Sequence, residues 1–372
     1  MPRESKHQLI SETLIKEIAA GQFKPSGRLP SEAQLVKRFG VSRPTVGRAL
    51  RELQDKGLIE RRAGSGSYVR HNRSTTDSTR QLGLLVPELR STEIFEVICG
   101  ALARLARVHD YGLLWEGRDA RESPEQDGID DAEALCQHYI DHKVSGVFFA
   151  PLEKHDNRDE LNHRLAVRLQ KAGISVVLLD RDLADFPQRS EFDLVGIDNF
   201  AAGFTVAEHL LKLDCKRLGF LLTRQSAPTA KLRIAGVREA ILARGIDIGK
   251  DFVQRCEPDD PSFLKKLTDK RKREFDAIIC GNDRTAATLL QSLTKAGVDV
   301  PKDIRMVGFD DVNYASLLSV PLTTMRQPCR DIAAVAFRAM IDSLEERDIP
   351  PRAYLLPATL VVRESCGAYA KS

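Results

Sequence analysis

The sequence lacks the features that mark membrane and secreted proteins. Its 372 residues contain no apolar run close to the roughly 20 residues that a membrane-spanning helix needs. The first residues, MPRESKHQLI, have neither the apolar core nor the cleavage site of a secretory signal peptide. We therefore expect a cytoplasmic protein.

Cysteines are present, but not in a pattern that indicates disulfides or a metal site. The seven cysteines are odd in number and widely spaced, and no C-x-x-C pair occurs. Neither a disulfide framework nor a zinc site is indicated, and we predict no metal and no cofactor. Several cysteines lie inside apolar runs, where a free thiol behaves as a small hydrophobic residue.

A large excess of charge is also missing from the chain as a whole, whose formal net charge is +3. The charge is unevenly distributed, however. Residues 1–73 contain 15 Lys or Arg and 7 Asp or Glu, a net charge of +8, whereas the remainder carries −5. A basic N-terminal part on a mildly acidic body indicates that the first part contacts a polyanion.

The N-terminal 71 residues predict three helices followed by a β-hairpin. Apolar residues at helical spacing predict a first helix that ends at Gly21, and Ser31 caps a second helix, SEAQLVKRFG. In the stretch GVSRPTVGRAL, Ser42 caps a third helix, which has an apolar stripe on one face and arginines on the other. The strands LIERRA and SYVR around GSG complete a winged helix-turn-helix.

The start of the third helix is suited to DNA. Small residues there let the helix approach a groove closely, hydroxyl and backbone N–H groups bind phosphate, and arginines reach base edges. A solvated helix face on a small structural domain is the alternative. The caps, the apolar stripe, the wing and the charge excess together favour DNA.

Three stretches, PSGRLPSEAQL, GVSRPTVGRAL and GLIERRAGSGSYV, resemble the winged-helix domain of the GntR family of bacterial transcription regulators over residues 5–71. The resemblance implies DNA contacts from these residues: Arg28, Ser31, Ser42, Arg43, Thr45, Arg48, Gly64 and Gly66. The family often places arginines where Ala33 and Gly47 stand, so the operator sequence is left open.

Behind the DNA-binding domain, residues 1–71, the polar residues 72–80 predict a flexible linker. The remainder, residues 81–372, alternates short apolar runs with longer amphipathic stretches, which predicts parallel sheets with crossover helices. The predicted strands are LGLLV, GLLW, GVFF, SVVLL, DLVGI, RLGFLL, DAIIC and RMVGF. So many strands favour two doubly wound α/β lobes. The expected lobes are an N-lobe of residues 81–193 and 327–346 and a C-lobe of residues 194–326 and 350–372.

Parallel α/β lobes bind ligands at the carboxyl ends of their strands. The residues found there are Glu88, Glu116, Pro151, Asp180, Thr223, Asn282 and Asp310. No nucleophile elbow, P-loop or H-E-x-x-H motif accompanies them, so we predict that the protein is not an enzyme. Carboxylates accept pairs of hydroxyls and a guanidinium donates to several oxygens, which suits a small polyhydroxy ligand.

The body also resembles a known family. The stretches VGIDNFAAGFTVAEHLL, TAKLRIAGVREAI, CGNDRTA and VGFDDVNYASLLSVPLTTMRQP are similar to the sensor domain of the lac repressor/GalR family, itself similar to periplasmic sugar-binding proteins. The resemblance implies effector contacts from Phe95, Asp180, Thr229, Arg233, Asn282, Asp283 and Gln327. Asn282 or Asp283 could instead cap the following helix, and Arg233 could form an interlobe ion pair. The hinge helix of the lac repressor is missing.

A GntR-type head on a GalR-type body resembles the arabinose-type repressors. We therefore expect a sequence-specific DNA-binding regulator, a homodimeric repressor that a sugar-like effector releases from a palindromic double-stranded DNA operator. One alternative is a corepressor-dependent regulator with a purine-type effector. Another is an aminotransferase-like body, which would need a Schiff-base lysine in a phosphate-binding context. A transport protein is a third, which the basic head disfavours.

Overall fold

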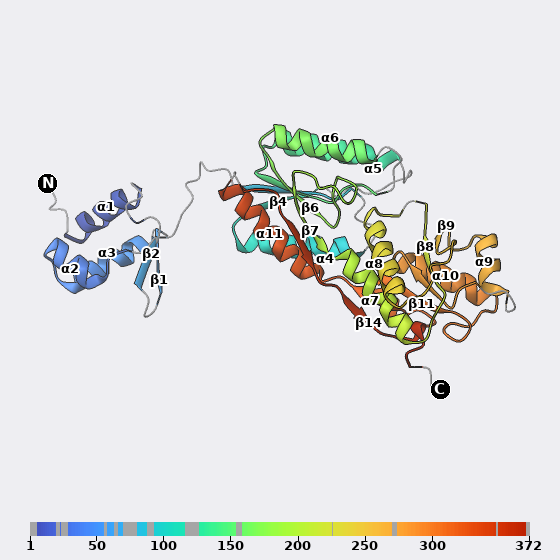
Figure 1. Ribbon diagram of the computed structural model, residues 1–372. Coiled ribbons are helices and arrows are strands. Elements are labelled where there is room, and N and C mark those ends of the chain that lie inside the picture. Colours follow the sequence, from blue (N-terminus) through green and yellow to red (C-terminus); the bar gives the residue numbers. More distant parts are fainter. Residues whose placement is uncertain are drawn as a thin grey trace. The chain divides into compact units, whose positions relative to one another are not determined.

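The structure, a computed structural model, divides into two units, Met1–Ser78 and Thr79–Ser372 (Figure 1). It describes residues 6–19, 23, 29–55, 58–62, 66–69, 80–87, 93–115, 126–153, 158–224, 226–269, 274–346 and 349–369. Several predicted features lie outside the described residues: most of the linker (72–79), Arg28, Gly64, Glu88 and Glu116.

The first unit contains the three helices and the antiparallel hairpin that the sequence predicts. They are α1 (Lys6–Ala19), α2 (Glu32–Phe39), α3 (Arg43–Asp55), β1 (Ile59–Arg62) and β2 (Gly66–Val69). One core joins them, formed by Ile10, Leu14, Leu29, Leu35, Val46, Ala49, Leu50, Leu53 and Ile59. Because the apolar residues of α3 recur every three or four positions, one face of this helix is buried and its arginines remain outside.

Local hydrogen bonds fix the turn between α2 and α3. The Ser31 hydroxyl accepts from the Gln34 N–H, and the Ser31 N–H donates to the Gln34 side chain at 2.8 Å, which is a capping box. Gly40 has a φ of 61°, a conformation that a residue without Cβ adopts at little steric cost, and its N–H donates to Val36. The Ser42 carbonyl accepts the first backbone hydrogen bonds of α3.

The second unit contains two six-stranded sheets. The N-lobe sheet has the order β13-β7-β6-β5-β3-β4 and is parallel, and the C-lobe sheet has the order β14-β12-β11-β10-β8-β9 and is parallel except for the pair β12–β14. The strands are β3 (Gln81–Leu85), β4 (Gly112–Leu114), β5 (Gly146–Phe149), β6 (Ser175–Leu179), β7 (Asp193–Ile197), β8 (Leu218–Leu222), β9 (Val253–Arg255), β10 (Ala277–Cys280), β11 (Arg305–Asp310), β12 (Thr323–Arg326), β13 (Ala353–Leu356) and β14 (Thr359–Val361). The predicted two-lobed parallel α/β fold is confirmed.

Helices cover both faces of each sheet. They are α4 (Glu93–Val108), α5 (Gln126–Asp141), α6 (Arg158–Lys171), α7 (Asn199–Lys212), α8 (Thr229–Ala243), α9 (Pro261–Thr268), α10 (Asp283–Lys295) and α11 (Cys329–Glu345), with the 3-10 turns η2 (Asn313–Ser316) and η3 (Glu364–Cys366). Helices α5 and α6 cover one face of the N-lobe sheet and α4 and α11 the other (Figure 1). In the described ranges, no helix has the length and apolarity to cross a bilayer.

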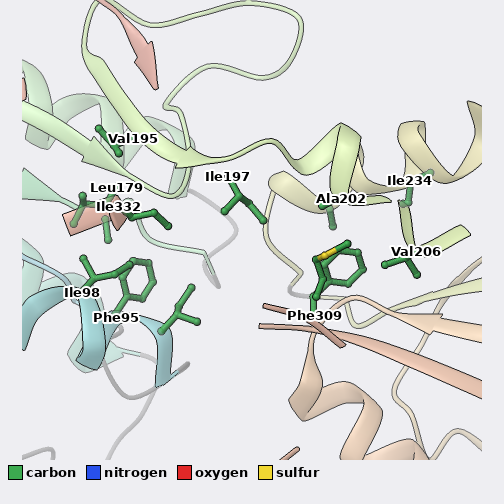
Figure 2. Close-up of a cluster of buried hydrophobic side chains, with 14 of the residues drawn as sticks. Phe95, Ile98, Leu179, Val195, Ile197, Ala202, Val206, Ile234, Phe309 and Ile332 are labelled. Atoms are coloured by element: carbon green, nitrogen blue, oxygen red, sulfur yellow. The ribbon is translucent and has the colours of Figure 1, made fainter. Parts of the chain in front are cut away.

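One hydrophobic core continues from lobe to lobe. Figure 2 shows Phe95 and Leu179 on the N-lobe side, Ala202 and Phe309 on the C-lobe side, and Ile197 between them. Ile197 is the last residue of β7, where the chain leaves the first sheet for α7. The crossing segment is therefore itself buried, which ties the ends of the two lobes together.

The expected lobe borders are wrong at two strands. Strand β7 and strand β13, both assigned to the C-lobe from the sequence, belong to the N-lobe sheet, where Ala353 pairs with Leu194. The chain crosses between lobes after β7, after β12 and between β13 and β14. Strand β13, AYLL, is short and alternates exposed with half-buried residues, so the sequence does not show which of the two sheets it joins.

Helices α7 and α8 cross with their backbones in contact. A Cβ built on Gly203 would lie 2.0 Å from the Arg233 carbonyl oxygen, and one on Gly236 would lie 2.0 Å from the Phe200 carbonyl oxygen. No real Cβ tolerates such a distance to backbone. The two glycines therefore permit the close approach that positions the start of α8.

We expect Gly236→Ala to lower the free energy of unfolding of the sensor unit by about 1–3 kcal/mol, because the helices must separate to admit the methyl group. Urea denaturation followed by circular dichroism measures the change. Gly100→Ala in α4 is the matched control: its Cβ would meet only an Arg104 side-chain atom at 3.9 Å. There the substitution should stabilise the helix by about 0.5–1 kcal/mol. Equal effects of the two substitutions would contradict the close-contact explanation.

Candidate functional site

A cavity of 410 Å³ lies between the two lobes, at the carboxyl ends of strands from both sheets. The residues singled out from the sequence that line it are Asp180, Thr223, Thr229, Arg233, Asn282, Asp310 and Gln327. Asp180 follows β6 of the N-lobe sheet, whereas Asp310 ends β11 of the C-lobe sheet. The fold thus brings residues that are far apart in the sequence to one place.

The N-lobe wall of the cavity is a buried arginine between two carboxylates. Arg181 donates to Asp180 Oδ2 at 3.1 Å and to Glu153 Oε2 at 2.9 Å. Its guanidinium lies 5.8 Å from the centre of the Phe95 ring. Asp180 has a φ of 70°, an unusual conformation for a residue with a side chain. Among the described residues, Asp180 Oδ1 is buried without a hydrogen-bond partner, so it can accept from a ligand.

On the C-lobe side, Arg233 is fixed from three directions. Its Nε donates to Asn199 Oδ1 at 2.7 Å and its Nη1 to the Gly281 carbonyl at 2.8 Å. The guanidinium also lies over the Phe309 ring, 4.4 Å from its centre. Arg233 is 5% exposed, and a buried guanidinium held in this way presents its remaining N–H groups in a fixed direction.

Asp310 lies close to these groups and has an unusual protonation equilibrium. One of its carboxylate oxygens accepts from Gln327 Nε2 at 2.8 Å, and its backbone φ is 110°. Burial is the largest influence on the pKa of Asp310 and raises it to about 6, and the negative charge of Asp180 raises it as well. The positive charge of Arg233 and the hydrogen bond from Gln327 lower the pKa, but by less. The cavity therefore contains a carboxyl group whose pKa, about 6, lies well above that of an exposed aspartate.

The cavity is lined by both donors and acceptors of hydrogen bonds. Carboxylates from both lobes offer acceptors, and Arg181 and Arg233 offer donors. Within the described part of the chain, no group of three or more His, Cys, Asp or Glu side chains is placed to hold a metal ion. A ligand with several hydroxyls satisfies acceptors and donors of this kind together.

Asn282 and Thr229 line the cavity where two helices begin. Asn282 is the N-cap of α10 and its side-chain oxygen accepts from the Thr285 N–H at 2.8 Å. The capping alternative is therefore correct for Asn282, which also lines the cavity. Thr229 is the first residue of α8 and is 7% exposed.

Asp283 does not line the cavity, contrary to the expectation. Its carboxylate is fully buried and accepts from the Thr324 hydroxyl at 2.6 Å and from the Val312 N–H at 3.1 Å. A Cβ on Gly308 would lie 2.2 Å from Asp283 Oδ1, so the glycine leaves room for this carboxylate. Burial, with the charge of Asp310, raises the pKa of Asp283. The side chain connects α10 to Thr324 of β12 and to Val312, two residues after β11.

Phe95 also differs from the expectation. The residue of α4 that lines the cavity is Ile94, whereas Phe95 is 2% exposed and belongs to the core (Figure 2). Its contact with the cavity is indirect, through the guanidinium of Arg181 over its ring. Adjacent helix residues differ by about 100° in direction, so the sequence alone does not distinguish which of the two faces the ligand.

We expect Asp283→Ala to lower the free energy of unfolding by about 1–3 kcal/mol, because it leaves the Val312 N–H and the Thr324 hydroxyl buried without their acceptor. Chemical denaturation measures this change. Effector affinity, measured well below the unfolding temperature, should change much less than in a variant of Asp310. A complete loss of ligand binding in a folded Asp283→Ala protein would contradict the assignment.

Four of the residues expected to contact DNA, Ser42, Arg43, Thr45 and Arg48, lie directly before α3 or in its first half. Arg48 is exposed, the Ser42 and Thr45 hydroxyl oxygens are 2.8 Å apart, and the Arg43 Nε donates to Glu32 at 3.2 Å. The Ser31 hydroxyl takes part in the cap of α2, and Gly66 begins the wing strand β2. The helix thus presents hydroxyls and guanidinium groups on its solvent side, as DNA recognition requires.

Sequence reasoning missed Arg181, Glu153 and Asn199. Arg181 directly follows Asp180 in the stretch LLDRDL, so its position after a strand was a usable signal. Glu153 lies two residues after Pro151, in the segment that follows β5. Asn199 begins α7, on another crossing segment, and its contact with Arg233 depends on how α7 and α8 cross. That contact leaves no local signal.

Comparisons with known proteins agree with both units. Residues 6–69 match the family model of bacterial regulatory proteins, gntR family, and residues 207–366 match the periplasmic binding protein-like domain. The arabinose metabolism transcriptional repressor of Geobacillus stearothermophilus is 24% identical over 364 residues, 92% of each chain.

Two solved structures share the fold of the sensor unit. The complex of the transcriptional regulator CelR with cellobiose has a TM-score of 0.62 and 22% identity, and the match covers 87% of this chain and 91% of that one. The transcription regulator CcpA of Lactococcus lactis has a TM-score of 0.62 and 18% identity, over 77% of this chain and 99% of that one. The chain is a transcriptional regulator in which a gntR-type helix-turn-helix domain precedes a periplasmic binding protein-like sensor domain, similar over its length to the arabinose repressors.

Proposed function

We propose that this regulator is a homodimeric repressor that binds a palindromic operator through its first unit and releases it when a small sugar occupies the cavity of its second unit. The observation that carries the proposal is the cavity: Asp180 and Asp310, one from each lobe, line it together with the fixed guanidinium of Arg233. The names of relatives support a sugar, since one is an arabinose repressor and another is solved with cellobiose.

The charges of the first unit support the DNA-binding half of the proposal. The exposed side of α3 carries Arg43, Arg48 and Arg51, while its other side is buried in the core. The ion pair of Arg43 with Glu32 is exposed at its arginine end, so it contributes little stability and can be exchanged for a phosphate contact. Arg48, the residue next to Gly47, is the candidate for base recognition.

The lobes suggest how the effector acts. Lys231 of α8 pairs with Asp185 of the N-lobe at 2.8 Å, and Glu93 of α4 accepts from the Asn313 N–H of the C-lobe at 2.8 Å. These contacts cross between the lobes outside the cavity. A ligand that forms hydrogen bonds with both Asp180 and Asp310 binds best when the lobes are arranged so that it reaches both side chains. Binding therefore shifts the population of lobe arrangements toward that one. In a dimer, such a shift changes how the DNA-binding units are spaced.

We expect Arg48→Ala to weaken binding to the cognate operator by about 1–3 kcal/mol while changing the salt dependence little, as for loss of a base contact. Fluorescence anisotropy with DNA from upstream of the protein's own gene, at several salt concentrations, measures both quantities. Arg338→Ala, which removes an exposed arginine of the sensor unit, is the control and should have no effect.

In the same assay, adding sugars tests the direction of the response. Release of the operator supports the proposed repressor, and tighter binding would show that the effector is a corepressor instead. An equal loss for Arg48→Ala on every DNA sequence would show that Arg48 contacts only phosphate.

We expect the affinity for the sugar to fall as the pH decreases from about 7.5 to about 5. Effector hydroxyls need an ionised acceptor, and Asp310, whose pKa burial raises to about 6, becomes protonated in this range. One pH unit below that pKa, about one Asp310 carboxyl group in ten is ionised, so the affinity should be about tenfold weaker than at about pH 7.5. Isothermal titration calorimetry across the range measures it. In Asp310→Asn the affinity should be weak and nearly independent of pH, and a pH-independent wild type would argue against Asp310 as an acceptor.

A further inference from the structure

The cavity extends further along the C-lobe sheet than the predicted effector contacts do. Five neighbouring strands, β12, β11, β10, β8 and β9, contribute a lining residue at or just after their carboxyl ends: Gln327, Asp310, Gly281, Thr223 and Glu257. Neighbouring strands lie about 4.8 Å apart, so the first and the last of these ends are roughly 19 Å apart.

Two sections of the cavity differ in burial. The inner section is lined by residues of both lobes: Glu153, Asp180, Arg181, Arg233, Asp310 and Gln327. The outer section comprises Thr223, Ser226, Glu257, Asp259, Arg284 and Thr288, all from the C-lobe. Most of the inner residues are buried, whereas Glu257, Asp259, Arg284 and Thr288 are exposed. All six outer side chains can donate or accept hydrogen bonds.

The size of the cavity exceeds what one sugar ring needs. A six-membered ring with its hydroxyl oxygens spans roughly 6 Å, about 3 Å across the ring and about 1.5 Å for each of two C–O bonds. An engineered protein cavity of about 150 Å³ holds one benzene ring. A hexose has twelve non-hydrogen atoms against the six of benzene, so it needs on the order of 300 Å³. The cavity measures 410 Å³, which is more than that. One ring bound to Asp180, Asp310 and Arg233 would therefore leave part of the cavity unfilled, at its outer end.

We propose that the effector is a disaccharide, with one ring in the inner section and the second held in the outer section by Glu257, Arg284 and Thr288. This inference rests on the proposed sugar-binding function. Two carboxylates and one guanidinium in the outer section, Glu257, Asp259 and Arg284, offer acceptors and donors to a neutral ring. The excess of carboxylates disfavours a phosphorylated sugar there.

The test compares each disaccharide with its own monosaccharide by calorimetry on the full-length protein. Suitable pairs are D-glucose with maltose and cellobiose, D-galactose with lactose, D-xylose with xylobiose, and L-arabinose with arabinobiose. We expect one disaccharide to bind at least about tenfold more tightly than its monosaccharide. Glu257→Gln and Arg284→Ala should each remove much of this gain, about tenfold for a hydrogen bond to a charged group.

Two variants separate the possible failures. Glu239→Gln changes an exposed glutamate further along α8, outside the cavity lining, and is the matched control for Glu257→Gln. Asp310→Asn probes the inner section. A monosaccharide that binds as tightly as its disaccharides, depends on Asp310 and is unaffected by Glu257→Gln would overturn the disaccharide proposal and leave the sugar-binding function intact. Binding of none of these sugars would overturn both.

Discussion

The Arg233 guanidinium connects four parts of the sensor unit. It donates to Asn199 at the start of α7 and to the Gly281 carbonyl after β10, and it lies over the Phe309 ring of β11, while its own backbone belongs to α8. A buried cation is tolerated only where hydrogen bonds and a nearby opposite charge replace water, and Asp310 supplies that charge. The position of α8, and hence of this arginine, depends in turn on the backbone contact at Gly203 and Gly236.

The carboxylates of the two lobes are arranged differently. Asp180 is paired with Arg181 through one oxygen only, and the other oxygen is buried without a partner among the described residues. Asp310 is held by Gln327, which lies where the chain crosses between lobes after β12. Both aspartates have positive φ angles, of 70° and 110°. Such backbone conformations cost free energy and persist where the surrounding structure holds them, most often at functional sites.

Neighbouring residues in this site have different roles for geometrical reasons. Asn282 caps α10 and lines the cavity, whereas Asp283, one residue further, does not line it and accepts from Thr324 and Val312. Ile94 lines the cavity and Phe95 packs in the core. In each pair the sequence predicted the helical turn that lies at the cavity. Which of the two residues lines the cavity depends on the direction of each side chain. A rotation of about 100° per helical residue is enough to exchange a ligand contact for a structural one.

The winged helix-turn-helix and the parallel strands could be predicted from the sequence, because both depend on local signals. Caps such as Ser31, the glycine turn at Gly40 and uninterrupted apolar runs act over a few residues. Three features could not be predicted in this way: β13 returns to the N-lobe sheet, Asn199 accepts from Arg233, and Asp283 bonds Thr324 and does not line the cavity. Those outcomes depend on contacts between residues distant in the chain, whose pairing is set by packing over the whole unit and leaves no periodic pattern in the sequence.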